Sequence, residues 1–332
     1  MTNVLADKHH AGLFRSLQLL ADRMGWTLYT PTGHEWFDEW VWSFGRSTYG
    51  DDRLARQFLG WTDPDPEFPD VPINYVTIEQ AQAMDWAFVI ASVPDNEAGF
   101  AKFAREHGAE YVLQVGNTGQ AIDWSRNPLA IVSSEMPILG RGVRYHQEME
   151  PIEYVPPDPG IFVGRVGDKS YRVGRTVASF VNCMTSMGRC WDLLQEAAES
   201  VPTLIYGIDG PQGVLKPFSG LVERMASVGW GWHDKAQGDG FGHVIHSWAA
   251  VGRPLIGHAS HYAGRMAEHF WQDGITCIDL DRHSIRDAVE IVRTISPEDH
   301  ERMCRAIRAE FDTIDYAAEA EAIRELLTAV PA

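Results

Sequence analysis

Cysteine and positive charge are both scarce in this chain of 332 residues. The cysteines, Cys183, Cys190, Cys277 and Cys304, show no C-x-x-C spacing, which argues against a disulfide framework or a zinc site and indicates reduced thiols. No run of about eighteen apolar residues occurs, so we expect no membrane span. The start of the chain has no cationic segment followed by an apolar one, which predicts no secretion signal and a cytoplasmic location.

The charge balance limits the partners of the chain. The chain has 28 Lys and Arg residues and 46 Asp and Glu residues, and its formal net charge of −18 is spread over both halves. Broad non-specific binding to nucleic acid needs a basic field, so the composition argues against it and leaves only a local basic groove open. No sequence feature indicates an oligomeric state.

Short apolar strands alternate with helical periodicity along most of the chain, which favours parallel sheets. In the first half we expect strands at 3–6, 26–29, 86–91 and 111–115, with helices at 13–24 and 97–107. The proline-rich segment 146–160 is typical of a linker. In the second half we expect strands at 177–181, 203–207, 228–232 and 276–280, with helices at 191–200, 218–227, 284–294, 297–311 and 316–329. The sequence therefore predicts an α/β protein with two Rossmann-like parallel-sheet domains.

Residues 34–70 interrupt this alternation with a dense set of aromatic residues and interleaved arginines, including Trp36, Trp40 and Arg46. Aromatic faces stack on sugars or on exposed bases, and arginines hold phosphates, which favours an acceptor-binding role for these residues. A cap whose aromatics form a satellite core explains the composition equally well. The acidic stretch 63–70 would repel DNA if it lined the same face.

The most informative segment is 239–254, D-G-F-G-H-V-I-H-S-W-A-A-V-G-R-P. Glycines at its start let the backbone take positive φ and approach a ligand closely. The helix expected after them directs unpaired N–H groups and its positive dipole end at the turn, which forms an anion site suited to a phosphate. The exit through Gly252-x-Pro254 leads to apolar Leu255 and Ile256, which indicates the next strand.

This segment resembles the second half of GT-B glycosyltransferases, which often carries E-G-F-G-x-x-x-x-E-A-x-A-x-G-x-P. The matching residues, without a gap, are Gly240, Phe241, Gly242, Ala250, Gly252 and Pro254. The resemblance places Asp239 at the first acidic position, usually near the transferred sugar, and Ser247 where a second Glu usually holds the donor ribose. A serine hydroxyl lacks the bidentate carboxylate contact to a diol, so Ser247 departs from the family and leaves the donor open.

A second matching segment, 182–194, corresponds to the family pattern G-R-x-x-x-x-x-K-G-x-D-L-L. Arg189 stands at the lysine position, where a guanidinium grips phosphate well, whereas Cys183 replaces the family arginine. Lys235, Arg172 or Arg175 is a candidate for the missing charge. The resemblance implies no cofactor but a nucleotide-sugar co-substrate, with UDP-sugar favoured, and these donor-binding residues: Arg189, Lys235, Gly240, Phe241, Gly242, His243 and Ser247.

The resemblance also implies a plan for the domains. We expect an acceptor-side domain at 1–155 and a nucleotide-sugar domain at 160–312 that face each other across a cleft. A C-terminal helix within 313–332 is expected to cross back to the first domain.

The first half is similar to predicted phage-type glycosyltransferases in K-H-H-A-G-L-F-R-S-L from Lys8 and in T-P-T-G-H-E-W ending at Trp36. For some of these, hydroxymethylated pyrimidines in DNA, such as 5-hydroxymethylcytosine, are the suggested acceptors. The resemblance therefore implies a DNA acceptor in a host cytoplasm, with the target base extruded from the duplex, and places His9 and Gly12 on the acceptor side.

The catalytic base has several candidates. His10 directly follows the first strand, at the sheet edge where ligands bind, and a neutral imidazole there can orient or deprotonate an acceptor hydroxyl. His9 is adjacent and can take the same role. Asp95 is another candidate base, although Pro94-Asp95-Asn96 also fits an ordinary helix start. The match at Asp239 favours retention of the anomeric configuration.

Five histidines gather near the expected donor site: His233, His243, His246, His258 and His261. They show no H-E-x-x-H or comparable spacing and no paired carboxylates, so we expect no metal site and a metal-independent transfer. Three alternatives share the architecture: transfer to a small-molecule or glycan acceptor, a sugar-nucleotide epimerase, and a binding protein that has lost the chemistry.

Overall fold

The chain divides into two compact units in the computed structural model. Unit 1 comprises Met1–Glu150 and Asp315–Ala332, and unit 2 comprises Pro151–Ile314. The described residues are 2–8, 11–32, 68–92, 94–117, 122–157, 162–166, 169–181, 187–207 and 210–329. The boundary at 150/151 lies slightly before the expected 155–160, and unit 1 takes up the last segment from Asp315 rather than from residue 313.

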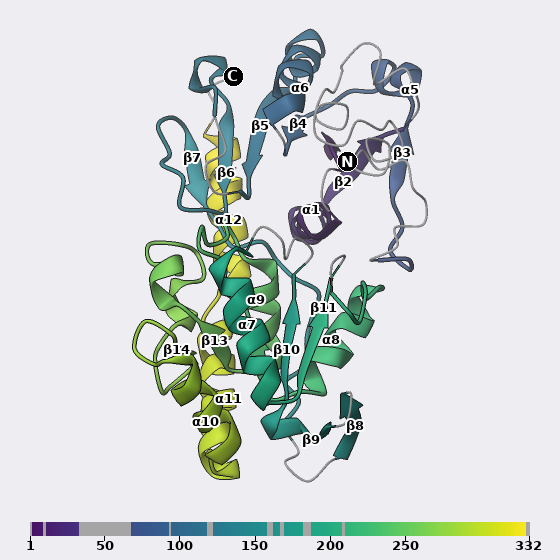
Figure 1. The fold of residues 1–332 in the computed structure, drawn as a ribbon. Helices are drawn as coiled ribbons and strands as arrows, with labels where there is room; N and C mark the ends of the chain where they lie inside the picture. Colours follow the sequence, from purple (N-terminus) through teal and green to yellow (C-terminus); the bar gives the residue numbers. More distant parts are fainter. Residues whose placement is uncertain are drawn as a thin grey trace. The chain divides into compact units, whose positions relative to one another are not determined.

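Unit 1 is built on a seven-stranded sheet in which all neighbouring strands are parallel, in the order β3-β2-β1-β4-β5-β6-β7 (Figure 1). Its strands are β1 (Thr2–Ala6), β2 (Trp26–Pro31), β3 (Asn74–Val76), β4 (Phe88–Ala91), β5 (Glu110–Val115), β6 (Leu129–Val132) and β7 (Gly142–Arg144). Its helices are α1 (Ala11–Met24), α5 (Ile78–Gln82), α6 (Pro94–Glu106) and α12 (Tyr316–Thr328). The sequence analysis did not predict β3, β6 and β7, which have three or four residues each.

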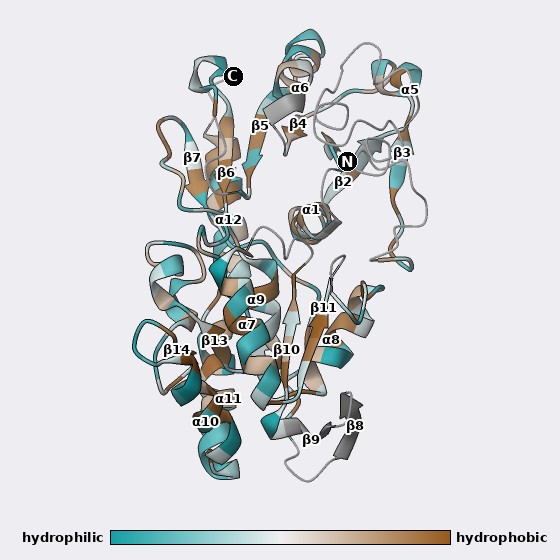
Figure 2. Cartoon of the chain, in the orientation of Figure 1, coloured by the Kyte–Doolittle hydropathy of each residue, from teal (hydrophilic) through white to brown (hydrophobic). Residues whose placement is uncertain are grey.

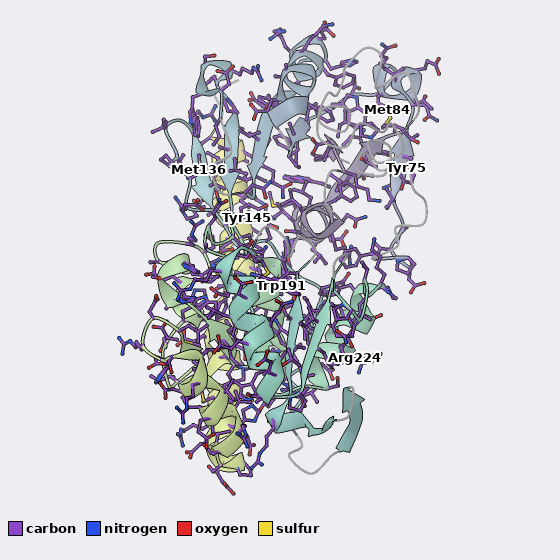
Figure 3. The ribbon with its side chains drawn as sticks, in the orientation of Figure 1. Tyr75, Met84, Met136, Tyr145, Trp191 and Arg224 are labelled. Atoms are coloured by element: carbon purple, nitrogen blue, oxygen red, sulfur yellow. The ribbon has the colours of Figure 1, made fainter. Side chains whose placement is uncertain are left out.

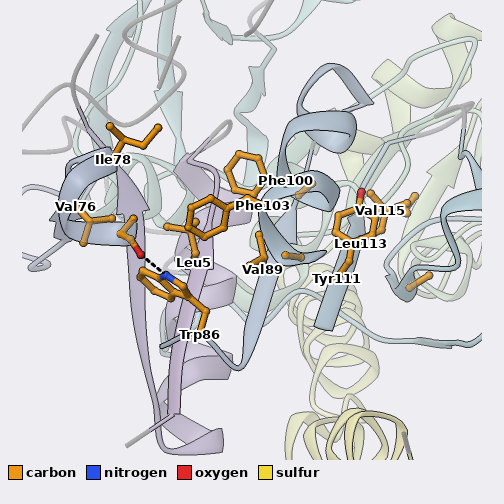
Figure 4. Packing of buried hydrophobic residues seen from close by; sticks show 14 of the residues in the cluster. Leu5, Val76, Ile78, Trp86, Val89, Phe100, Phe103, Tyr111, Leu113 and Val115 are labelled. Atoms are coloured by element: carbon orange, nitrogen blue, oxygen red, sulfur yellow. Dashed lines mark hydrogen bonds between the residues drawn. The ribbon is translucent and has the colours of Figure 1, made fainter. Parts of the chain in front are cut away.

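Both faces of this sheet are buried, because side chains of a strand alternate between them. On β1, Leu5 packs into the cluster drawn in Figure 4, whereas Val4 and Ala6 belong to the cluster on the other face. In the first cluster the indole Nε1 of Trp86 donates a hydrogen bond of 2.8 Å to the carbonyl of Ala81, so the one polar atom of the ring is satisfied.

Helix α12 belongs to unit 1 by its packing. Ala320, Ile323 and Leu327 share the second cluster with Phe14 and Leu17 of α1. Burying one Ile or Leu side chain stabilises by about 1.5–3 kcal/mol, so the apolar face of α12 contributes roughly 3–6 kcal/mol to its attachment. The last helix is therefore a structural part of unit 1.

Unit 2 contains a five-stranded parallel sheet in the order β11-β10-β12-β13-β14. Its strands are β10 (Val177–Phe180), β11 (Thr203–Tyr206), β12 (Trp230–Trp232), β13 (Leu255–Gly257) and β14 (Cys277–Asp279), and an antiparallel pair, β8 (Phe162–Val166) and β9 (Lys169–Arg172), precedes them. Its helices are α7 (Arg189–Ser200), α8 (Phe218–Ala226), α9 (His243–Val251), α10 (Ile285–Thr294) and α11 (Pro297–Phe311). Figure 2 shows β11 mostly brown and the outer turns of α10 mostly teal, as expected for a buried sheet under amphipathic helices.

Local sequence signals explain where the late helices begin. Ser284 accepts a hydrogen bond from the backbone N–H of Asp287, whose side chain bonds back to Ser284, so α10 starts with a capping box. Helix α11 starts at Ser296 with Pro297 in its first turn, where a missing N–H is harmless. The expected spans 284–294 and 297–311 agree with these helices to within one residue.

The exit of α9 is fixed by a buried arginine. Arg253, the middle residue of Gly-x-Pro, is 0% exposed and donates to the carbonyls of Val228 (2.7 Å), Ala226 (2.7 Å) and Val155 (2.8 Å). Gly252 has φ of +77°, and an added Cβ there would lie 2.5 Å from the ring of Tyr154. This exit therefore needs glycine, and the arginine ties the end of α9 to the end of α8 and to the segment that enters unit 2.

Candidate functional site

The strand order of unit 2 reverses direction between β10 and β12. The chain goes from β10 to β11 on one side and then returns to β12, β13 and β14 on the other side. In parallel α/β sheets, ligands bind beyond the carboxyl ends of the strands at such a switch point. The segments that leave these two ends are the start of α7 after β10, and the loop 233–242 with the start of α9 after β12.

The structure brings these two segments together. Sγ of Cys190, in the first turn of α7, and a carboxylate oxygen of Asp234, just after β12, lie within 4.8 Å of each other. Arg189 precedes Cys190 and is exposed, and its guanidinium has no hydrogen bond or ion pair within the described residues. The positively charged Arg189 is thus free to bind an anion at the switch point.

Both helices at the switch point begin without a side-chain cap. Helix α7 follows Gly188 (φ +54°) and α9 follows Gly242 (φ +81°), and within the described part of the chain neither N-cap position makes a side-chain capping hydrogen bond. Their first N–H groups and positive dipole ends are therefore left for another acceptor, as at many phosphate sites. Gly240, which is buried, and Gly242 form the turn into α9 as the sequence predicted.

Asp239 is the electrostatic centre of the loop. Its Oδ2 lies 2.5 Å from Nε2 of buried His233, and its Oδ1 accepts a hydrogen bond of 2.6 Å from Nζ of Lys235. Burial acts to raise the pKa of Asp239, but His233 and Lys235 outweigh burial and hold this pKa well below its ordinary value. Asp239 is therefore a fixed anion with a side chain that is still 20% exposed. Such a group accepts hydrogen bonds well but is a poor proton carrier.

Two other predicted donor residues, Phe241 and Ser247, make contacts within the protein. Phe241 is 2% exposed, and its ring stacks on His246 at 3.9 Å and meets His243 edge-on at 5.0 Å between ring centroids. Ser247 is also 2% exposed and donates its hydroxyl proton to the carbonyl of His243 at 2.8 Å. His246, expected at the surface or on the donor, is fully buried. The side chains of Phe241 and Ser247 are thus held inside unit 2, and Gly240 and Gly242 of this turn are buried as well.

Unit 1 has a second switch point between β1 and β4. The backbone N–H of Ser92, after β4, donates to Oδ1 of Asp7, after β1, at 2.8 Å. Ser92 also donates to Gln114, which donates to the hydroxyl of Tyr145. Tyr145 is labelled in Figure 3. This buried chain of hydrogen bonds fixes the ends of both strands.

The structure describes only some of the residues predicted for the acceptor side and for the catalytic base. His9, His10, Trp36, Trp40 and Arg46 lie outside the described residues, as does nearly all of the 34–70 insertion. Gly12, expected in a turn, is the second residue of α1, because the helix starts at Ala11. Asp95 lies in the first turn of α6, and its side chain is outside the described part. The segments with His10 and Asp95 nevertheless follow the two strands that flank the switch point.

One titratable residue near this edge was missed by the sequence reasoning. Glu97, in α6, has a side chain that is only 3% exposed, and its Oε1 has no hydrogen-bond partner in the described structure. Burial raises the pKa of Glu97 to about 7, with Arg126 at 3.5 Å opposing the shift. Perturbed carboxyls of this kind are enriched at functional sites. The sequence gave no signal because Glu97 occupies an ordinary helical position.

The structure also gathers four side chains of residue types that can bind a metal ion, which the sequence reasoning did not group together. Cys190, Asp234, His258 and His261 each offer one ligand atom, and these atoms lie within 4.8 Å of one another. Burial first, and the nearby Asp234 second, raise the pKa of the Cys190 thiol to about 12. Only the i, i+3 spacing of the two histidines was visible in the sequence.

Comparison with known proteins tests the fold. No protein-family model matches the chain, and no curated protein matches its sequence. HepE from Anabaena in complex with UDP-glucose aligns over 99% of this chain and 100% of its own, with a TM-score of 0.63 and 13% identity. An α-glucosyltransferase in complex with UDP aligns over 99% and 100%, with a TM-score of 0.61 and 8% identity. The chain has the GT-B glycosyltransferase fold.

The predicted α/β class with two Rossmann-like GT-B domains is therefore confirmed. Sucrose-phosphate synthase from Thermosynechococcus elongatus shares this GT-B fold over 99% of this chain and 100% of its own, with a TM-score of 0.62 and 11% identity. Among the described residues, no helix is long and apolar enough to cross a membrane.

Proposed function

We propose that this chain is a hexosyltransferase that moves a sugar from a UDP-sugar, with UDP-glucose the first candidate, to an acceptor hydroxyl. One observation carries the proposal: two helix starts without a side-chain cap, an arginine that has no partner among the described residues, and a fixed carboxylate all follow the two strands that flank the switch point of unit 2. UDP and UDP-glucose in the complexes of proteins with the same fold support this donor class.

Charge at the switch point suits the departure of a nucleoside diphosphate. As the bond between the anomeric carbon and the diphosphate oxygen breaks, negative charge grows on the diphosphate. The guanidinium of Arg189 and the N–H groups at the starts of α7 and α9 stabilise this charge in position, without a metal ion at the diphosphate. Positioned donors of this kind act more strongly in the transition state than in the ground state, which is the requirement for catalysis.

Asp239 binds the transferred sugar and does not act as the catalytic base. Because His233 and Lys235 keep its carboxylate ionised, it accepts hydrogen bonds from sugar hydroxyls and holds the ring in place. The proton of the acceptor hydroxyl then needs another base, and His10 and Asp95 remain our candidates on unit 1, with His9 as a substitute.

Donor binding is the first test. Thermal shifts with a panel of nucleotide sugars should be largest for UDP-sugars. Arg189→Ala should weaken UDP binding by roughly 10-fold or more, since one charge-assisted hydrogen bond is worth about 1.5–3 kcal/mol. Arg293→Ala is the matched control, because Arg293 is an exposed arginine on α10 that follows neither β10 nor β12. No shift with any donor, for a folded protein, would refute the proposal.

For the acceptor we propose a 5-hydroxymethylpyrimidine in DNA, on the sequence similarity of the first half and the aromatic and arginine residues Trp36, Trp40 and Arg46. Mass spectrometry of hydroxymethylated and unmodified DNA, incubated with enzyme and donor, should show added sugar only on the former. Added sugar on neither DNA excludes this acceptor but leaves the donor proposal intact. Conversion of the donor without any acceptor would instead indicate an epimerase.

A further inference from the structure

Three separate segments of unit 2 bring metal-binding atoms to one point. Cys190 comes from the first turn of α7, Asp234 from the residues after β12, and His258 and His261 from the residues after β13. The sequence-based expectation of no metal rested on the spacing of ligands along the chain. Such spacing cannot reveal a group of ligands that comes from three separate segments of the fold.

Hydrogen bonds already order the two imidazoles around the carboxylate. Nδ1 of His258 lies 2.9 Å from Oδ2 of Asp234, and Nδ1 of His261 lies 2.8 Å from Oδ1. His261 lies in the 3₁₀ helix Ala259–Tyr262, directly after His258, and side chains three residues apart eclipse each other there. The two ring centroids are accordingly only 4.7 Å apart.

The side chains that pair with the carboxylate of this group are the two histidines. Asp234 is 0% exposed, and it pairs with no lysine or arginine among the described residues; the neighbouring Lys235 binds Asp239 instead. A buried carboxylate without a compensating charge is costly. A divalent cation bound by one carboxylate, one thiolate and two neutral imidazoles would make the whole group neutral.

We propose that Cys190, Asp234, His258 and His261 form a four-coordinate zinc site. One sulfur, one oxygen and two nitrogen ligands are the donor set that zinc prefers, and a closed set of four is typical of structural zinc. Tetrahedral bonds of about 2.0–2.3 Å place ligand atoms roughly 3.3–3.8 Å apart, so the observed group needs only small adjustments.

The protons balance in a simple way. Zinc binding replaces the two N–H···O hydrogen bonds by bonds from the Nδ1 atoms to the metal, and each imidazole keeps one proton on Nε2 through exchange with water. The thiol of Cys190 loses its proton to solvent. The partly exposed rings, 22% for His258 and 21% for His261, give water the access that this exchange needs.

The ion would act as a clamp between elements. It would fasten the start of α7 and the 3₁₀ helix after β13 to Asp234, which directly precedes Lys235 in the loop that carries Asp239. The zinc site therefore goes beyond the proposed glycosyl transfer, because its role is to hold the loop in place.

Cobalt titration tests the site without any sugar donor. Full-length protein is freed of metal by chelation, shown to be folded by circular dichroism, and titrated with Co²⁺. We expect one Co²⁺ per chain, with visible bands of tetrahedral cobalt and a near-ultraviolet thiolate-to-cobalt band, all displaced by Zn²⁺. Folded wild-type protein that gives no tetrahedral spectrum overturns the proposal, whatever the outcome of the donor assays.

Matched variants assign the ligands. Cys190→Ser should abolish the thiolate band, whereas Cys277→Ser, at another buried cysteine of unit 2, should retain it. His258→Gln should weaken Co²⁺ binding by more than the roughly 10–100-fold typical of losing an outer hydrogen-bond partner. His283→Gln, which breaks the equivalent pair with Asp273, should leave it unchanged. A thiolate band that persists in Cys190→Ser refutes the site as assigned.

Discussion

Glu97 makes the stability of unit 1 depend on pH near neutrality. Its Oε1 is buried and has no hydrogen-bond partner among the described residues, and Nη1 of Arg126, itself 34% exposed, is 3.5 Å from Oε2. Burial therefore dominates and raises the pKa of Glu97 from 4.5 to about 7. An unfolded chain exposes the same carboxyl to water and restores its ordinary pKa.

The sign and size of the effect follow from linkage. Between the two pKa values the folded state holds a proton that the unfolded state has lost, so the free energy of unfolding falls as pH rises through this window. A difference of roughly 2.5 pKa units corresponds to about 3 kcal/mol, all of it lost once pH exceeds the folded pKa of about 7. Glu97→Gln removes the titrating group, so the variant should be more stable than wild type by up to about 3 kcal/mol near pH 8 and nearly equal near pH 4.

Urea unfolding of both proteins at several pH values measures this difference. Hydrogen–deuterium exchange of peptides from β4 and β5 assigns the transition to unit 1, because a chain with two units need not unfold in one step. Glu106→Gln is the control: Glu106 lies on the same helix, is 51% exposed and pairs with Lys102. Parallel stability curves for wild type and Glu97→Gln would refute the reasoning, and a similar change in Glu106→Gln would assign it to the charge of α6.

Two further substitutions test the site and the sheet beneath it. Asp239→Asn keeps the shape of the side chain but removes the negative charge held by His233. We expect kcat for sugar transfer, measured by UDP release, to fall by roughly 10²-fold or more. An unchanged kcat would exclude Asp239 from the site. Gly231→Ala should lower the free energy of unfolding by about 1–3 kcal/mol or more, because the added Cβ would lie 2.5 Å from Cδ2 of buried Trp248. Gly220→Ala, in α8 with nothing within 4 Å of the new Cβ, should instead be neutral or stabilising. If both substitutions lowered the free energy of unfolding equally, the contact with Trp248 would not be the cause of the loss.

Much of the fold was predictable because its elements carry strong local signals. The spans of α10 and α11 followed from amphipathic periodicity, and the serine caps seen at Ser284 and Ser296 explain their starts. The turn at Gly240 and Gly242 was predictable because only glycine takes the backbone conformation seen at Gly242 without strain. Three or four residues do not define a period by themselves, and β3, β6 and β7 were missed although the equally short β12, β13 and β14 were predicted.

The candidate site was only half visible in the sequence. Arg189 and Asp239 were found through their motifs, but the partnership of Asp239 with buried His233 and Lys235, and its lowered pKa, came from the tertiary structure. Glu97 carried no motif at all. Its role depends on burial, which a helical pattern does not report for a single carboxylate.

Local order in the chain, namely the alternation of strands and helices and the glycine-rich start of α9, was determined by the sequence itself, because periodicity and backbone freedom act over a few residues. The meeting of Cys190, Asp234, His258 and His261 was decided only by the tertiary structure. Parallel strands bring their carboxyl ends to one edge of the sheet, and residues far apart along the chain become neighbours there.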